Sequence, residues 1–291
     1  MLKQNILIFG SNGMLGKYCE SYFSNVIALK GKTYNIIPIV RADFDIVNVT
    51  QESLLQFLKS HNIQENDVVI NCAGVIPQSS ATRELTTKST FIVNSIFPIL
   101  VSNICNQLNA NFIHITTDCV FNGKDSSIFQ KSGLYTEESC ANETSDYGMS
   151  KSLGEYCSGT IIRTSIIGEE LINKRSLLEW VRSNKTKSIK GYSNHMWNGV
   201  TCLQLAKIIE QIIYLDKYWS GVRHVYSPIS VSKYELVEMI NEIYELNCII
   251  EPVETPVAIN KTISSVYPLN KQLHIPHLYT QIQEMQQYVL K

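Results

Sequence analysis

The chain has 291 residues, of which 44% are hydrophobic and 18% are charged, and a formal net charge of −1 at pH 7. This length suffices for one large α/β domain and a smaller lobe. A nearly neutral chain offers no basic field for a polyanionic backbone, so nucleic acid is not expected as the main partner.

The eight cysteines are scattered along the chain without a C-x-x-C pair. Their spacing indicates neither a zinc site nor a disulfide framework, and we expect no metal. The N-terminal run MLKQNILIFG leads directly into a strand pattern and leaves no room for a secretory leader. No apolar stretch approaches the roughly 20 residues of a membrane helix. We therefore expect a cytoplasmic protein without a membrane segment.

Short apolar runs rich in β-branched residues recur through the first half of the chain, at 5–10, 35–40, 67–74, 111–118 and 160–168. Segments with helical spacing lie between them, among them 52–61 and 90–109. Apolar strands that alternate with helices indicate a parallel sheet covered on both faces. The predicted fold class is α/β, with a Rossmann-type doubly wound parallel sheet.

The pattern changes after about residue 170, where helical segments alternate with short strand-like runs such as VRHVYS. We predict a large domain over 1–168, to which a segment near 200–226 returns, and a smaller α/β lobe mainly over 169–291. No linker separates the two, so the lobe should pack directly on the sheet domain with a ligand cleft between them.

The stretch GSNGMLG places three glycines directly after the first strand and at the start of a helix. Gly10 permits a tight turn, Gly13 a close approach of the backbone to a pyrophosphate, and Gly16 a close helix-to-strand contact. The helix N-terminus adds N–H donors. The loop therefore predicts dinucleotide binding, with the intervening contacts from Asn12, Met14 and Leu15. Its G-x-x-G-x-x-G spacing resembles that of short-chain dehydrogenases and reductases.

The run IPIVRADFDI offers Arg41 where the adenosine ribose of a dinucleotide lies. An arginine pairs with a 2′-phosphate, which favours NADPH over NADH. If NVIALKGK is the second strand instead, Lys30 or Lys32 takes this role. Asp45 and Ile46 resemble the adenine-edge contact of the same family.

The segment NCAGVIP follows the third strand run. It resembles the next cofactor-lining loop, with Cys72, Ala73 and Gly74 as the lining residues. Small side chains there let a cofactor approach. Val75 is expected to contact the substrate.

The segment YGMSK places Tyr147 and Lys151 four residues apart, on one face of a helix. An ammonium beside a phenol stabilises its phenolate and makes it a better proton donor at neutral pH. Thr117, at the tip of the fourth strand, could join Tyr147 in holding a substrate carbonyl. Thr116 competes for this role, but its side chain should point to the opposite face of the sheet.

The ordered set GSNGMLG, TTDCVFNG, YTEES, YGMSKSLGE and IIRTSIIG resembles the extended short-chain reductases of the dTDP-4-dehydrorhamnose reductase family over nearly the whole chain. The resemblance implies that Thr117, Tyr147 and Lys151 are catalytic. It also implies that residues 1–168 bind NADP, and that the lobe over 169–291 binds a nucleotide sugar.

Cys119 departs from the simple rhamnose reductases, which carry tyrosine at this position. GDP-fucose synthase and the plant enzymes that make UDP-rhamnose carry a cysteine here, which moves a proton during epimerisation. The donors Thr117 and Tyr147 could stabilise both an enolate and an alkoxide on the same oxygen. The alternative is a buried, inert thiol.

Epimerisation also needs a second acid or base. We look for it in the segment GEELINKRSLLEW, which begins at the end of the strand run IIRTSIIG. Lys174 is the first candidate there, and Arg175 and Glu179 are lesser ones.

The segment YSNHMWNGVT falls where this family binds the nucleotide sugar. Trp197 could stack on a ring, and Asn194, His195 and Asn198 could bond hydroxyl or phosphate oxygens. Lys261 lies where relatives carry a basic residue near the diphosphate.

The resemblance implies an NADPH-dependent 3,5-epimerase/4-reductase that converts a nucleoside-diphosphate 4-keto-6-deoxyglucose, UDP favoured, to the L-rhamnose nucleotide. One alternative is a 4-reductase alone, which acts on the dTDP sugar after a separate epimerase. Another is a non-catalytic NADP-binding regulatory subunit. A homodimer is expected by family analogy alone.

Overall fold

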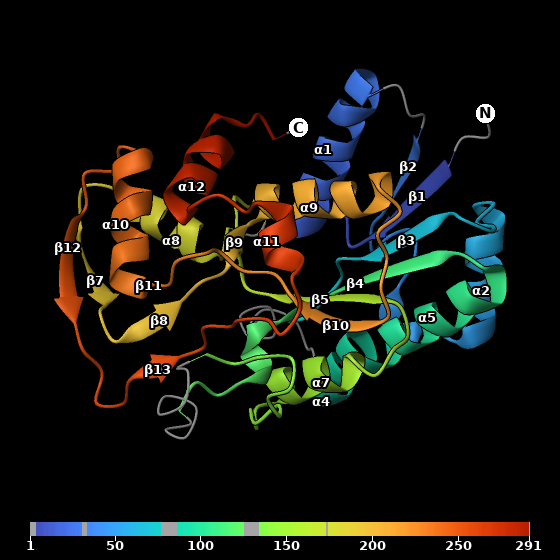
Figure 1. Ribbon diagram of the computed structural model, residues 1–291, viewed down its shortest axis with the longest axis horizontal. Coiled ribbons are helices and arrows are strands. Elements are labelled where there is room, and N and C mark those ends of the chain that lie inside the picture. Colours follow the sequence, from blue (N-terminus) through green and yellow to red (C-terminus); the bar gives the residue numbers. More distant parts are fainter. Residues whose placement is uncertain (1–3, 31–33, 77–85, 125–133, 173, 291) are drawn as a thin grey trace.

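The computed structural model describes residues 4–30, 34–76, 86–124, 134–172 and 174–290. Six parallel strands form one sheet in the order β10-β5-β4-β3-β1-β2. Their bounds are Gln4–Phe9 (β1), Tyr34–Ile39 (β2), Val68–Asn71 (β3), Asn111–Thr117 (β4), Thr160–Thr164 (β5) and Gly221–His224 (β10). The predicted Rossmann-type sheet is confirmed (Figure 1).

The second strand is the run at 34–39, and not NVIALKGK. The latter run belongs to the first helix, α1 (Met14–Lys30), so the alternative strand assignment is wrong. Of the two lysines it would have brought forward, the side chain of Lys30 and all of Lys32 lie outside the described residues.

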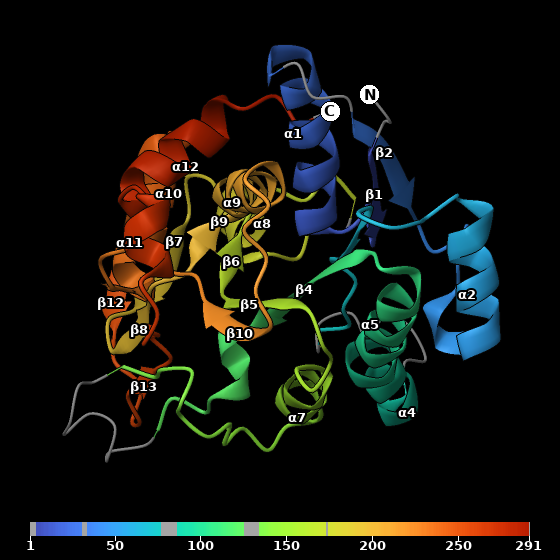
Figure 2. The same cartoon turned by 45° about the vertical axis from the view of Figure 1, so that its right-hand side comes forward.

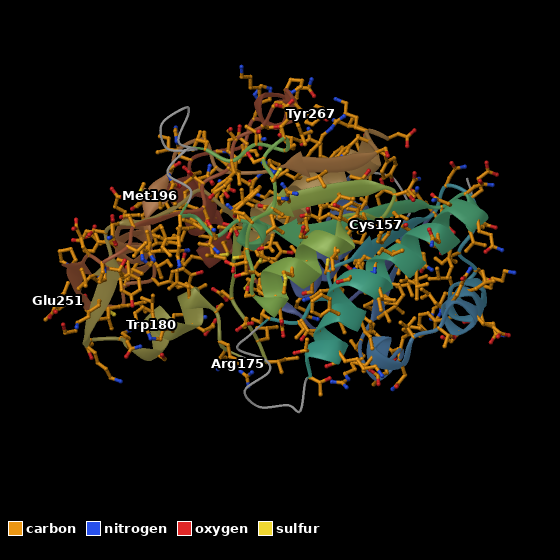
Figure 3. All side chains as sticks on the ribbon, turned by 90° about the horizontal axis from the view of Figure 1, so that it is seen from below. Cys157, Arg175, Trp180, Met196, Glu251 and Tyr267 are labelled. Atoms are coloured by element: carbon orange, nitrogen blue, oxygen red, sulfur yellow. The ribbon has the colours of Figure 1, made fainter. Side chains whose placement is uncertain are left out.

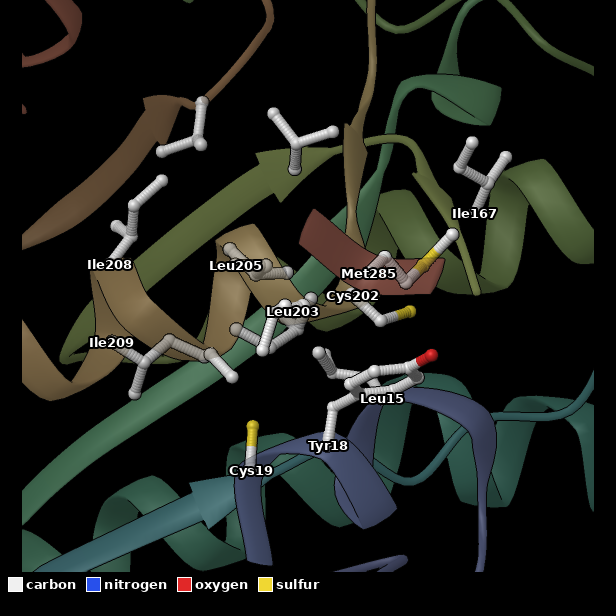
Figure 4. Packing of buried hydrophobic residues seen from close by; sticks show 14 of the residues in the cluster. Leu15, Tyr18, Cys19, Ile167, Cys202, Leu203, Leu205, Ile208, Ile209 and Met285 are labelled. Carbon is white, nitrogen blue, oxygen red and sulfur yellow. The ribbon is translucent and has the colours of Figure 1, made fainter. Parts of the chain in front are cut away.

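Helices cover both faces of the sheet, as Figures 1 and 2 show. One face carries α1 and α9 (Cys202–Tyr214), and the other carries α2 (Gln51–Ser60), α4 (Thr87–Phe91), α5 (Phe97–Leu108) and α7 (Asp146–Gly154). Strand β1 alternates accordingly, with Ile6 and Ile8 in one core and Leu7 and Phe9 in the other. Figure 4 shows the first core, where α1 packs on α9.

The segment Thr87–Leu108 is helical throughout, because the π-helical turn η2 (Ile92–Ile96) joins α4 to α5. By length and composition it could cross a membrane, so the expectation that no stretch approaches this length is wrong. Half of its most apolar stretch is buried inside the protein. Phe97, Val101 and Ile104 form part of the core beneath the sheet, as in a core helix.

The C-terminal lobe combines small sheets with helices (Figure 1). Its strands are β7 (Ser188–Tyr192), β8 (His195–Trp197), β11 (Val231–Ser232), β12 (Ile249–Val253) and β13 (Ile259–Asn260). Its helices are α8 (Leu177–Ser183), α10 (Lys233–Ile243), α11 (Leu269–Leu273) and α12 (Leu278–Gln287). A short parallel pair, β6 (Ile166–Ile167) with β9 (Val200–Thr201), links the lobe to the end of β5.

One hydrophobic core runs without interruption from α1 and α9 into α8, α10 and α12. Two elements within 200–226, α9 and β10, join the large sheet domain. The division of the chain at residue 168 stays a prediction.

Candidate active site

The fourth strand ends in two threonines whose side chains have separate partners. The Thr117 hydroxyl accepts a hydrogen bond from the Cys119 amide at 3.1 Å and donates one to Asp118 Oδ1 at 3.2 Å. It also hydrogen-bonds the side chain of Tyr147. The Thr116 hydroxyl donates to Glu155 Oε1 at 2.9 Å and is buried. The structure therefore brings Thr117, and not Thr116, to Tyr147.

Helix α7 carries Tyr147 and Lys151 one turn apart. Burial raises the pKa of Tyr147, the neighbouring Cys119 raises it further, and the hydrogen bond between Tyr147 and Thr117 lowers it. Burial also lowers the pKa of Lys151 to about 8, against the opposing effects of Glu155 and Cys72. We expected the ammonium to set the pKa of the phenol, but burial dominates both groups here.

The loop after β3 lies directly against Lys151. A Cβ on Gly74 would lie 2.9 Å from Lys151 Nζ, so a side chain at this position would displace the ammonium. Asn94, in the π-helical turn, accepts from the Val75 amide at 2.9 Å and donates to Val75 O and Ser150 Oγ at 3.0 Å each. Asn94 thus ties the loop to α7.

Sequence reasoning missed Asn94. Its signal was present, because a lone amide stands in the otherwise apolar helical run TFIVNSIFPIL. A fully buried amide in such a position needs hydrogen-bond partners from another element.

The glycine loop has the predicted geometry. Gly10 has φ +77°, and a Cβ on Gly16 would lie 2.2 Å from the Gly10 carbonyl oxygen. The Ser11 hydroxyl is buried, and none of the described residues bonds it. Asn12 is exposed, whereas the side chain of Leu15 packs into the core between α1 and α9 (Figure 4). Leu15 can therefore meet a cofactor only through its backbone.

Arg41 stands just beyond the carboxyl end of β2. Its side chain is 57% exposed, and Nε lies 3.5 Å from Asp45 Oδ1. Asp45 caps the 3-10 turn η1 (Ile46–Asn48), and Ile46 packs against the core beneath α2 and α5. The Gly10 amide bonds the Ile39 carbonyl at 3.0 Å, so Arg41 and the glycine loop share one end of the sheet.

Cys119 lies in the 3-10 turn η3 (Asp118–Val120), and its thiol donates a hydrogen bond to the Asp118 carboxylate. Asp118 is only 4% exposed. Burial, together with the Asp118 charge, raises the pKa of Cys119 to about 12. The group in place at neutral pH is therefore a thiol, which can give a proton but is a weak base.

None of the three predicted partners of Cys119 is brought to it within the described part of the chain. Lys174 is exposed on the loop before α8, and Arg175 lies at the outer edge of the molecule (Figure 3). Glu179 accepts from the Glu170 amide and from Arg182, both at 3.1 Å. The structure does not bring Lys174 to Cys119, because its side chain is exposed, and its acid-base role stays a prediction.

Lys233, the first residue of α10, lies near Cys119 instead. Its ammonium interacts electrostatically with Asp118, Cys119 and Lys261, and it lies 4.7 Å from the centroid of the Trp197 ring. A cation at a helix N-terminus opposes the helix dipole, which was a signal in the sequence VSKYEL that we did not use.

Two lobe residues that were predicted to contact the ligand, Asn198 and Trp197, bond to other parts of the protein instead. Both amide atoms of Asn198 bond the Ile263 backbone, at 2.8 and 3.0 Å. Trp197 is buried, donates to Ser165 Oγ at 2.7 Å and carries Lys233 on its ring. Both residues are therefore structural here, which corrects the predicted hydroxyl contact and ring stacking.

Two more of the lobe residues have partners of their own. The Asn194 amide bonds the Thr255 backbone at 2.8 and 3.1 Å, and His195 Nε2 lies 2.8 Å from Thr255 Oγ1. Lys261 Nζ lies 3.7 Å from Glu143 Oε2. The Lys261 charge also acts on Cys119, and its contact with a diphosphate stays a prediction.

Comparison with known proteins agrees with the fold. The model of the family described as RmlD substrate binding domain matches residues 4–266. The spore coat polysaccharide biosynthesis protein SpsK of Bacillus subtilis is 26% identical over 270 residues, which cover 90% of this chain and 87% of that protein. The dTDP-4-keto-6-deoxy-D-glucose reductase of Streptomyces niveus is 24% identical over 245 residues, or 80% and 76% of the two chains.

The solved structure of a dTDP-4-dehydrorhamnose reductase from Bacillus anthracis, in complex with NADP, superposes with a TM-score of 0.76. It covers 98% of this chain and 99% of that one at 20% identity, which is a likeness of fold.

Proposed function

The chain belongs to the RmlD substrate-binding-domain family, and from this premise we propose that it is a reductase that uses NADPH on the C4 ketone of a nucleoside-diphosphate 4-keto-6-deoxyhexose. The observation that carries the proposal is the hydrogen bond between Thr117 and Tyr147, with Lys151 one turn along the same helix and directly against Gly74. One of the relatives is a dTDP-4-keto-6-deoxy-D-glucose reductase, and another is a spore coat polysaccharide biosynthesis protein.

The residues present fit a dinucleotide. Gly10 and Gly16 leave the loop bare of side chains, and the buried Ser11 hydroxyl has no partner among the described residues. Helix α1 directs its first N–H groups at this loop, which suits a pyrophosphate. Lys151, held over Gly74, would reach the nicotinamide ribose. When bound, NADPH supplies the hydride.

The remaining chemistry falls to protein side chains. As negative charge develops on the C4 oxygen, the hydroxyl groups of Thr117 and Tyr147 donate hydrogen bonds to it, and Tyr147 gives up its proton. The high pKa of Tyr147 keeps this proton in place until it is needed. Lys151 carries positive charge below pH about 8, which stabilises the phenolate left behind.

We extend the proposal to epimerisation at C3 and C5, with Cys119 as one of the proton-transferring groups. The support is its place beside Tyr147 and Thr117, the two groups that would hold the enolate oxygen. Its raised pKa suits a proton donor. UDP is the favoured nucleotide, because the plant enzymes that carry this cysteine use UDP sugars.

Replacing Cys119 by serine tests the epimerase. Purified protein is incubated with NADPH and UDP-4-keto-6-deoxyglucose in D₂O, and the product is read by NMR. Wild type should yield the L-rhamnose nucleotide with deuterium at C3 and C5. The variant should lose this deuterium and still reduce a substrate that is already epimerised. Reduction without inversion or deuterium in wild type would leave a 4-reductase alone.

Replacing Arg41 by alanine tests the cofactor preference. A charge-assisted hydrogen bond to the 2′-phosphate contributes about 1.5–3 kcal/mol, so the KM for NADPH should rise roughly 10- to 100-fold. The KM for NADH should stay within about twofold. Steady-state kinetics with both cofactors measure this, and an equal change for NADH would show that Arg41 does not contact the phosphate.

We place the enzyme in the cytoplasm. All eight cysteines are unpaired, which suits a reducing compartment. The homodimer stays a prediction from the family.

A further inference from the structure

The position of the Lys233 side chain is fixed by two elements of the C-terminal lobe. Strand β11 pairs with β8, so that Val231 lies opposite Trp197. Ser232 then caps α10, accepting from the Glu235 amide at 3.1 Å. Lys233 follows immediately and lays its ammonium 4.7 Å from the centroid of the Trp197 ring.

The Trp197 ring is itself held at the edge of the sheet domain. Its Nε1–H donates to Ser165 Oγ at 2.7 Å, one residue beyond β5. Trp197 is only 3% exposed. The ring therefore presents Lys233 to the sheet domain at a defined place, and a cation on an indole face is stabilised there.

The charged and titratable groups around the Lys233 ammonium come from three elements, of which β8 contributes His195, whose pKa is lowered by burial and by the Lys233 charge. Asp118 and Cys119 belong to the turn η3, and Lys261 follows β13. Lys261 lies 3.7 Å from Glu143, whereas none of the carboxylates in the described part of the chain lies within ion-pair distance of Lys233 Nζ. Asp118 takes its hydrogen bonds from Thr117 and Cys119.

The Lys233 side chain is partly buried, and an ammonium that gives up water without a hydrogen-bonded counter-ion does not stabilise the fold. Its place at the start of α10 adds an unfavourable interaction with the helix dipole. The fold itself gains little from Lys233 beyond the contact with Trp197. The position is one at which a neighbouring ligand can make use of the group.

We propose that Lys233 is the second acid-base group of the epimerisation, paired with Cys119 on the opposite face of the sugar. This inference rests on the proposed epimerase function. It replaces the exposed Lys174 with a lysine that the fold brings to Asp118 and Cys119.

The proton transfers balance as follows. The neutral amine of Lys233 removes the proton from a carbon next to the ketone, and the C–H electron pair forms the enolate on the C4 oxygen. The Cys119 thiol gives its proton to the other face of that carbon, and the ketone returns. Lys233 is left as ammonium and Cys119 as thiolate. Transfer of one proton from the ammonium to the thiolate, through Asp118, restores both groups.

The direction of transfer agrees with the environment of each group. Burial lowers the pKa of Lys233 and so increases the share of neutral amine. Burial raises the pKa of Cys119 to about 12, so the thiol keeps its proton until the enolate takes it. The hydrogen bond from the thiol to Asp118 provides the route for the proton's return.

The test compares Lys233→Met and Lys233→Arg with Lys174→Met, the matched control at an exposed lysine. Deuterium incorporation at C3 and C5 in D₂O and NADPH oxidation with a pre-epimerised substrate are measured for each. Both Lys233 variants should lose about 10²- to 10⁴-fold in the rate of deuterium incorporation and keep reduction within a few-fold. Lys174→Met should match wild type in both measurements.

Arginine keeps the positive charge on Trp197 but does not release a proton at neutral pH. Lys233→Arg therefore keeps the proposal testable if Lys233→Met fails to fold. Deuterium incorporation at the wild-type rate in either variant would overturn the acid-base role. If wild type itself reduces the substrate without incorporating deuterium, the epimerase function fails, and the proposed role of Lys233 fails with it while the reductase stands.

Discussion

Replacing Tyr147 by phenylalanine is expected to lower the kcat for reduction by about 10²- to 10⁴-fold, the contribution of a positioned general acid. The phenol hydrogen-bonds Thr117, and its removal would leave one hydroxyl to hold the C4 oxygen. The KM for NADPH should stay within a few-fold, because Lys151 and the glycine loop are untouched. The rate of NADPH oxidation with a 4-keto sugar nucleotide measures the effect.

Tyr156 gives a matched control for this prediction. It lies just beyond α7 and is 81% exposed, so Tyr156→Phe should leave kcat unchanged. A wild-type rate in Tyr147→Phe would show that another group supplies the proton. An absence of NADPH oxidation in wild type, with every 4-keto sugar nucleotide offered, would favour the non-catalytic NADP-binding subunit.

The fold could be predicted because its signals are local. Each strand run is apolar on both faces, as β1 shows by sending Ile8 to one core and Phe9 to the other. The glycines of the first loop predicted close backbone contacts that leave no room for a side chain, and the structure confirms this at Gly16. Tyr147 and Lys151 could be paired because the helix period alone places them on one face.

The partners of Cys119 could not be predicted in this way. Lys233 reaches the turn that contains Cys119 only through the pairing of β11 with β8 and the docking of the lobe. A residue 114 positions away carries no local signal of such a contact. The predicted ligand contacts of Asn194 and Asn198 failed for a related reason. A side-chain amide that can hydrogen-bond a ligand can equally hydrogen-bond the protein backbone, as both do here.

Arg163, on β5, belongs to the ion pair that is most completely buried among the described residues. Its guanidinium makes a bidentate pair with Glu155, with Nε to Oε1 at 2.9 Å. Both side chains are only 7% exposed. Nη1 donates to His224 Nε2 at 3.0 Å, and burial followed by the Arg163 charge lowers the pKa of that histidine to about 4. Neutral His224 therefore accepts from Arg163 and donates through Nδ1 to the Ser264 carbonyl.

Replacing Arg163 by methionine is expected to lower the free energy of unfolding by about 3–5 kcal/mol, because it leaves the Glu155 carboxylate buried without its cation. The double variant Arg163→Met with Glu155→Gln should lose less, since neither charge is then left unpaired. Urea unfolding, with the midpoint compared at an unchanged m-value, measures both variants. A double variant less stable than the single one would mean that the Glu155 carboxylate is held by Thr116 and its other neighbours without Arg163. In that case the pair serves to hold α7, and with it Lys151, in place on the sheet.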